Sequence, residues 1–111
     1  MSDVVDFQVV DDLQDAVGAE FLVELIETFL NEAPGMIAEL KQGEAAGDAD
    51  VMRRAAHSLK SNANTFGAFL LADAARDVET NGLGDAPDAT IDALQDAFDK
   101  AAALLKGRLD E

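Results

Sequence analysis

Residues 19–44, AEFLVELIETFLNEAPGMIAELKQGE, carry a long and regular helical pattern. Their apolar side chains recur at steps of three and four residues, which places them on one stripe of an α-helix. The stripe consists of Phe21, Leu22, Leu25, Ile26, Phe29, Leu30, Met36, Ile37 and Leu40. We expect one helix over these residues, kinked or divided where Pro34-Gly35 interrupts it. Because the stripe must be buried, other helices have to pack against it.

The segments before and after this stretch predict four more helices. A short helix is expected over about residues 11–17, and a third begins with Asp48 or Asp50 as its N-cap and runs to about residue 64. A fourth spans about residues 68–80, and the last opens with Pro87 in its first turn. The last helix has an apolar seam made of Ile91, Leu94, Phe98, Ala101 and Leu105. Long amphipathic helices with short connections predict an all-α fold, an up-down four-helix bundle with a short additional N-terminal helix.

The composition restricts the classes of function. The chain has 111 residues, enough for one hydrophobic core, and no cysteine, which excludes disulfides and thiolate metal sites. Asp and Glu number 23 against 8 Lys and Arg, a charge that repels nucleic acid and anionic membranes. No metal-binding motif occurs, no apolar run could span a bilayer and no basic-then-apolar leader opens the chain. We therefore expect a cytoplasmic monomer without a metal of its own, whose partners are other proteins.

His57 is the only histidine of the chain, and helical geometry places it away from the core. On a wheel with 100° per residue, the apolar residues of its helix fall within about 60° of Met52, whereas His57 falls at about 140°. The imidazole should therefore face solvent. Residues one or two turns away share this outer face: they are Arg53, Lys60, Ser61 and Asn64.

The charge pattern around His57 differs from that of the rest of the chain. Residues 51–72 include three basic side chains and no acidic one, whereas the remainder has 5 basic and all 23 acidic residues. We call the three basic side chains, Arg53, Arg54 and Lys60, the cationic patch. A covalently bound phosphoryl group needs a nucleophilic nitrogen, together with donors and positive charge for its oxygens. The pattern therefore indicates His57 as a phosphoacceptor assisted by Lys60, in an environment formed by Arg53, Ser61 and Asn64.

The string from His57 to Ala68, HSLKSNANTFGA, resembles the signature of histidine-containing phosphotransfer (HPt) domains. In that family His-x-Leu-Lys-Gly is followed by small residues, an apolar residue and a glycine. The stretches Phe29–Pro34 and Gly47–Asp50 add to the resemblance, which extends from about Phe7 to Leu105. It implies one HPt-like domain over residues 1–111, of the stand-alone bacterial type.

The resemblance also implies roles for particular residues. His57 would be phosphorylated on Nε2, Lys60 would lie beside the phosphoryl oxygens, and Gly67 would end the helix and let the next one pack closely. The function implied is a two-component phosphorelay, in which the phosphoryl group moves between His57 and aspartates of receiver domains. The partners would be response-regulator receiver domains and a hybrid histidine kinase. The Mg²⁺ of the reaction would belong to the receiver, and the chain, without an ATP site, would be a carrier with no cofactor rather than an enzyme.

Two positions depart from the family's pattern. Ser61 stands where the family commonly has glycine, and its side chain narrows the approach to the ring. Glu79 stands where the family often has glutamine, twenty-two residues after the histidine. A carboxylate beside His57 would favour the charged imidazolium and oppose the charge of a phosphoryl group. Either Glu79 points away from His57, or phosphoryl transfer in this protein has different energetics, and we expect the first.

A receiver needs an apolar surface to dock on, and three residues near His57 are candidates for it: Leu59, Phe66 and Phe69. The helical spacing otherwise places five phenylalanines in the core: Phe21, Phe29, Phe66, Phe69 and Phe98.

Other interpretations are possible for the same residues. A single histidine in a helical protein is most often an incidental surface or core residue. The bundle could also be an adaptor that binds a receiver or kinase without carrying phosphate. A carrier of acyl chains would need a serine in an Asp-Ser-Leu context at a helix start, whereas Ser58 follows His57 in mid-helix. The donor, the acceptor and the direction of phosphoryl flow stay open.

Overall fold

The computed structural model describes residues 4–110, so residues 1–3 and 111 of the expected domain lie outside the described part. It contains five helices: α1 (Phe7–Val17), α2 (Ala19–Ala46), α3 (Ala49–Thr65), α4 (Phe69–Asn81) and α5 (Pro87–Leu109). The described residues include no strand. The all-helical prediction is confirmed, and each expected helix is present. The first begins four residues earlier than expected, because the side chain of Asp6 caps it by accepting a hydrogen bond from the backbone N–H of Gln8 at 3.0 Å.

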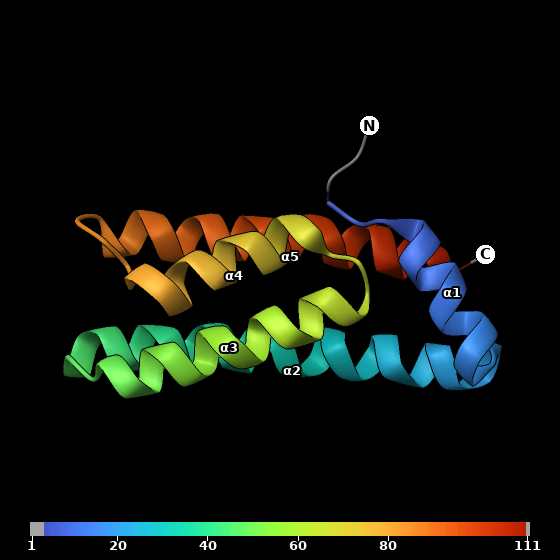
Figure 1. Cartoon of the computed structure of the whole chain (residues 1–111), viewed down its shortest axis with the longest axis horizontal. Coiled ribbons are helices and arrows are strands. Elements are labelled where there is room, and N and C mark those ends of the chain that lie inside the picture. The colour runs from blue at the N-terminus through green and yellow to red at the C-terminus, as the bar shows by residue number, and fades with distance from the viewer. Residues whose placement is uncertain (1–3, 111) are drawn as a thin grey trace.

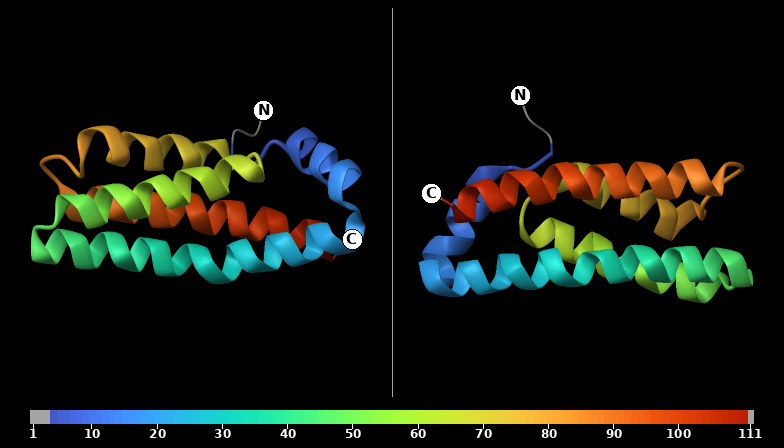
Figure 2. Two further views of the ribbon diagram at one scale, coloured as in Figure 1. Left: turned by 60° about the horizontal axis from the view of Figure 1, so that its bottom comes forward. Right: turned by 180° about the vertical axis from the view of Figure 1, so that it is seen from behind.

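The four longer helices, α2 to α5, lie side by side along the long axis of the molecule, and α1 lies across one end (Figures 1 and 2). Helix α3 packs against both α2 and α4, and α5 packs against α2 and α4. Helix α1 packs against the start of α2 and reaches the end of α5, where Arg108 forms an ion pair with Asp11 at 2.8 Å. No helix within residues 4–110 combines the length and the apolar character needed to cross a membrane.

The local signals in the sequence place most helix boundaries. Asp48, rather than Asp50, caps α3, and its side chain accepts a hydrogen bond from Val51 N–H at 3.1 Å. Pro87 occupies the first turn of α5, as expected. Pro34 does not divide α2, which continues through it from Ala19 to Ala46. The carbonyl that loses its helical partner there belongs to Leu30, which is half-buried, while Pro34 is exposed.

The core is apolar throughout the described residues and contains no buried charged or polar side chain. Phe29 of α2 lies at its centre. Its ring is 5.1 Å from that of Phe66, at the end of α3, and 5.8 Å from that of Phe98 on α5. The whole predicted seam of α5 is buried as well. These contacts tie the three long helices together by apolar burial and ring packing.

The expectation that five phenylalanines are buried is wrong for two of them. Phe21 is 49% exposed and Phe69 is 40% exposed. On α2, Leu22, Ile26 and Phe29 occupy the buried stripe, and Phe21 is one step of about 100° away from Leu22. Phe69 is the first residue of α4, whose buried face begins at Leu71 and Ala72. A prediction from helical spacing alone counts residues at the edge of the apolar stripe as buried. In the packed structure, the neighbouring helices do not cover these residues.

Gly67 forms the turn between α3 and α4, and the close contact there is made by α1. Its φ is +69°, and the backbone N–H of Asp6 donates to its carbonyl oxygen at 2.8 Å. A Cβ at this position would lie 2.7 Å from the carbonyl oxygen of Asp6 and 2.9 Å from the Cβ of Val9. The glycine was expected to let the next helix pack closely; instead the nearest atoms belong to the residues around the start of α1.

We predict that Gly67→Ala destabilises the protein more than Gly47→Ala does. Gly47 has nearly the same φ, +67°, but a Cβ there would meet nothing within 4 Å, so its replacement costs only the left-handed conformation, about 1–2 kcal/mol. Gly67→Ala adds overpacking of about 1–3 kcal/mol. Urea unfolding of the two variants measures the difference. Equal losses of stability would show that α1 does not depend on this contact.

Candidate functional site

The structure places His57 on the outer face of α3. Its side chain is 59% exposed, while Ala55, Ala56 and Leu59 on the same helix are buried. The prediction that the imidazole faces solvent is confirmed. The same helical geometry that buries the small apolar residues of α3 turns His57 outward, since it lies on the other side of the helix.

Glu79 of α4 points toward His57, so the expectation that it points away is wrong. Its Oε2 lies 2.5 Å from Nδ1 of His57, and its Oε1 lies 2.6 Å from Nζ of Lys60. Helix α4 runs back along α3 and brings Glu79 beside both side chains. Glu79 is only 20% exposed, and its two oxygens each have a cationic or N–H partner available on α3. The ion pair with Lys60 and the hydrogen bond to the ring of His57 stabilise this orientation by more than the side-chain entropy that Glu79 loses in it.

This contact determines which ring nitrogen can react. A carboxylate only accepts hydrogen bonds, so the neutral imidazole must carry its proton on Nδ1 to pair with Glu79. The lone pair is then on Nε2. Within residues 4–110, the side chain of His57 has no hydrogen bond or ion pair other than the one to Glu79. The nucleophilic nitrogen of this tautomer is therefore Nε2, on an exposed ring held in place from its other side.

Lys60 is held by the same carboxylate. Its side chain is 24% exposed, and its ammonium group donates to Oε1 of Glu79. The hydrogen bond from Lys60, followed by that from His57, lowers the pKa of Glu79 below its ordinary value of 4.5. Glu79 is therefore ionised at neutral pH. The cationic patch is thus less positive than the sequence indicates, because a carboxylate from another helix pairs with its lysine.

The other predicted site residues share the outer face of α3 but are less constrained. Arg53 is exposed and lies 3.8 Å from Asp50, a distance that gives an exposed pair little stability. Ser61 and Asn64 are exposed. Neither has a side-chain hydrogen bond within the described part of the chain. Their hydroxyl and amide groups are therefore available to an incoming ligand. The structure brings only His57, Lys60 and Glu79 into direct contact.

Two of the three residues expected to form a docking surface are buried. Leu59 lies in the core, and the buried ring of Phe66 packs against Phe29, so neither side chain is accessible to a partner. Both are close to His57 in sequence, but both lie on the side of the chain that faces the core. Phe69 is 40% exposed, and the neighbouring Leu70 is exposed to a similar degree.

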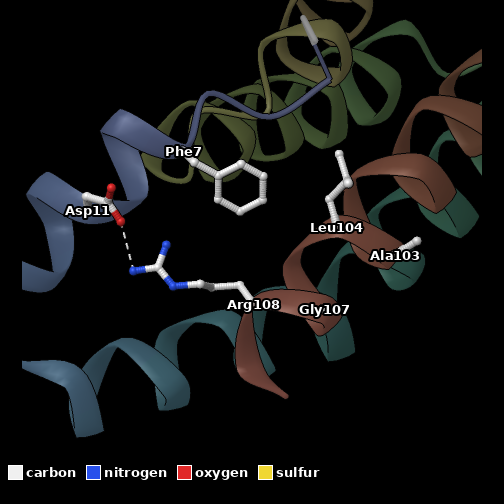
Figure 3. Close-up of a pocket in the computed structure, with 6 residues that line it drawn as sticks. All are labelled: Phe7, Asp11, Ala103, Leu104, Gly107 and Arg108. Carbon is white, nitrogen blue, oxygen red and sulfur yellow. Dashed lines mark ion pairs between the residues drawn. The ribbon is translucent and has the colours of Figure 1, made fainter. Parts of the chain in front are cut away.

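A separate hollow lies between α1 and α5 and does not include the site residues. Its volume is about 670 Å³, and its wall is formed by Phe7, Asp11, Ala103, Leu104, Gly107 and Arg108. The ion pair between Asp11 and Arg108 crosses it, and Leu104 projects into it from α5 (Figure 3). Among residues 4–110, no cluster of three or more acidic or histidine side chains could hold a metal ion.

We predict that Glu79 stabilises the fold at neutral pH and that acid removes this contribution. Because its pKa is lowered in the folded protein, the stabilisation is present above about pH 4.5 and is lost as the pH falls through the lowered value. The free energies of unfolding of the wild type and Glu79→Gln should differ at pH 7 and converge toward pH 3. The control is Asp92→Asn, which changes an exposed carboxylate on α5. A difference that does not vary with pH would contradict the prediction.

The comparisons with known proteins agree with this geometry. A family model described as Hpt domain matches residues 24–104. The structure is similar to the crystal structure of histidine-containing phosphotransfer protein B (HptB) from Pseudomonas aeruginosa PAO1, with a TM-score of 0.88 and 26% sequence identity over 97% of this chain and 96% of that chain. No curated protein matches the sequence. On the strength of the family match and this structural likeness, the chain belongs to the Hpt domain family.

Proposed function

We propose that His57 carries the phosphoryl group and that this chain passes it to or from aspartates of receiver domains. Histidine phosphotransfer in a phosphorelay is the function that the family match and the likeness to a phosphotransfer protein support. The observation that points to His57 is its exposed ring with Nδ1 held by Glu79, because that arrangement leaves the lone pair on Nε2.

The reaction would follow from this geometry. The lone pair of Nε2 attacks the phosphorus of an aspartyl phosphate, the bond from phosphorus to the aspartate oxygen breaks, and the carboxylate leaves. Lys60 would offer its ammonium group to the phosphoryl oxygens, and Ser61 and Asn64 would offer uncharged donors from the same helix face. Arg53 would add a weaker, screened attraction from its exposed position. The receiver would supply the Mg²⁺ that neutralises charge on the phosphoryl group.

We further propose that the chain is a carrier without an ATP site or a cofactor of its own. Its partners would be response-regulator receiver domains and a hybrid histidine kinase, and it would act in the cytoplasm as a monomer. The functional unit would be one domain over residues 1–111. Its architecture would be an up-down bundle of α2 to α5 with α1 as the additional helix.

A second function has one specific observation in its favour. Glu79 already pairs with both His57 and Lys60, so a phosphoryl group has to share Lys60 with a carboxylate. The chain could then bind a receiver or kinase as an adaptor without accepting phosphate. Phosphate on the protein that is labile in acid and stable in base identifies a phosphohistidine and excludes this alternative.

Incubation with a phosphorylated receiver and detection of labelled protein tests the proposal. His57→Gln should accept no phosphoryl group, because it lacks the nucleophile. Lys60→Ala should slow transfer by one to two orders of magnitude, which corresponds to about 1.5–3 kcal/mol for a charge-assisted contact in the transition state. Arg108→Ala, which alters a cation at the far end of α5, is the control and should transfer normally. Equal labelling of wild type and His57→Gln would overturn the proposal.

We also predict that Phe69 contributes to docking of the receiver. Phe69→Ser should raise the apparent Kd for a receiver several-fold, because a buried aromatic side chain at an interface contributes more than most contacts. Leu104→Ser is the matched control, since Leu104 has a similar exposure of 38% but lies in the hollow between α1 and α5. Titration of each variant with a receiver gives both constants. A larger effect from Leu104 than from Phe69 would place the docking surface at α1 and α5 instead.

A further inference from the structure

The hydrogen bond between the carboxylate of Glu79 and Nδ1 of His57 affects the phosphorylated protein as well as the unphosphorylated protein. The contact is made on the nitrogen that does not react, at 2.5 Å, by a side chain that is itself fixed through Lys60. A glutamine at position 79 could accept the same hydrogen bond, but it would carry no charge. For the ring itself, the difference between the two residues therefore matters most in a state where the ring carries a positive charge.

Phosphorylation creates that state. When Nε2 gives its lone pair to phosphorus, Nδ1 keeps its proton, and the imidazole ring becomes a cation. When a receiver carboxylate later attacks the phosphorus, the electrons of the P–N bond return to Nε2 and the ring leaves as neutral imidazole. No proton has to move in either direction. If Nδ1 lost its proton in between, the leaving group would be an imidazolate anion, and the P–N bond would break much more slowly.

We propose that Glu79 keeps the phosphorylated ring of His57 protonated on Nδ1 and thereby keeps the P–N bond ready for transfer. Glu79 acts here as a positioning residue through the ring, and the inference rests on His57 being the phosphorylated residue. It extends the proposed function, because it concerns how readily the phosphoryl group leaves rather than whether it arrives.

The charges around the ring support this assignment. From α3, Lys60 and Arg53 are cationic and would drive the proton off Nδ1. From α4, Glu79 opposes them at contact distance, while Arg76, one turn earlier, forms an ion pair with Asp73. Within residues 4–110, His57 makes no hydrogen bond or ion pair with a residue of α2. Glu79 is thus the group in contact with the ring that stabilises its positive charge.

The test compares the wild type with Glu79→Gln after phosphorylation by phosphoramidate, a small donor that does not require a receiver. At pH 9 the P–N bond should last about tenfold longer in Glu79→Gln, the effect of about one pH unit that a carboxylate at contact exerts on a charged neighbour. Nitrogen-15 spectra of the ring should report a larger protonated fraction of Nδ1 at this pH in the wild type than in the variant. Transfer to a receiver at pH 9 should slow by a similar factor.

Lys60→Met is the matched variant, because it removes the ammonium group from one oxygen of Glu79 but keeps the carboxylate that accepts the Nδ1 proton of His57. Its ring should stay protonated at pH 9 as in the wild type. The inference is overturned if the wild type and Glu79→Gln have the same bond lifetime and the same ring spectra, or if Lys60→Met behaves like Glu79→Gln. These outcomes are distinct from failure of the proposed function, which would appear as a His57 that gains phosphate from phosphoramidate but exchanges none with a receiver.

Discussion

The carboxylate of Glu79 joins two side chains of α3 from the neighbouring helix, and the arrangement of the site depends on this one interaction. One oxygen binds the ammonium group of Lys60 and the other accepts the Nδ1–H of His57. The pair of contacts fixes the tautomer, turns the lone pair toward solvent and lowers the charge of the cationic patch. A neutral residue in the same place could also fix the tautomer and direct the lone pair toward solvent, but it could not lower the charge of the patch. The site is therefore less cationic than its three basic residues alone would make it.

The fold supports this interaction by keeping its two helices together from the inside. Small buried residues of α3, such as Ala56 and Ala63, let the helix lie close to its neighbours, and Phe66 anchors its end on Phe29. Gly67 then reverses the chain within a turn that α1 covers closely. Because the core lacks buried polar groups among the described residues, every ionisable side chain of the site keeps some contact with solvent, and His57 is the most exposed of the three in contact.

The acidic composition gives the site a particular setting. A net charge of −15 surrounds a small region in which lysine and arginine side chains lie beside the only histidine. Most partners of such a protein are attracted or repelled by its overall charge at long range, and salt screens this effect. The contact between His57 and Glu79 acts at 2.5 Å, where screening is weak, so the reactivity of the ring is set locally.

The sequence by itself determined the number of helices, most of their ends and the outward direction of His57, because helical periodicity, capping residues and turn residues act over a few neighbouring positions. It also pointed to the family through His57, Lys60 and Gly67. Only the tertiary structure decided which side chain of α4 meets the ring, that Leu59 and Phe66 are covered while Phe21 and Phe69 are not, and that α1 closes over Gly67. Each of these depends on the rotation and register of one helix against another, and a local pattern does not specify how two packed surfaces meet.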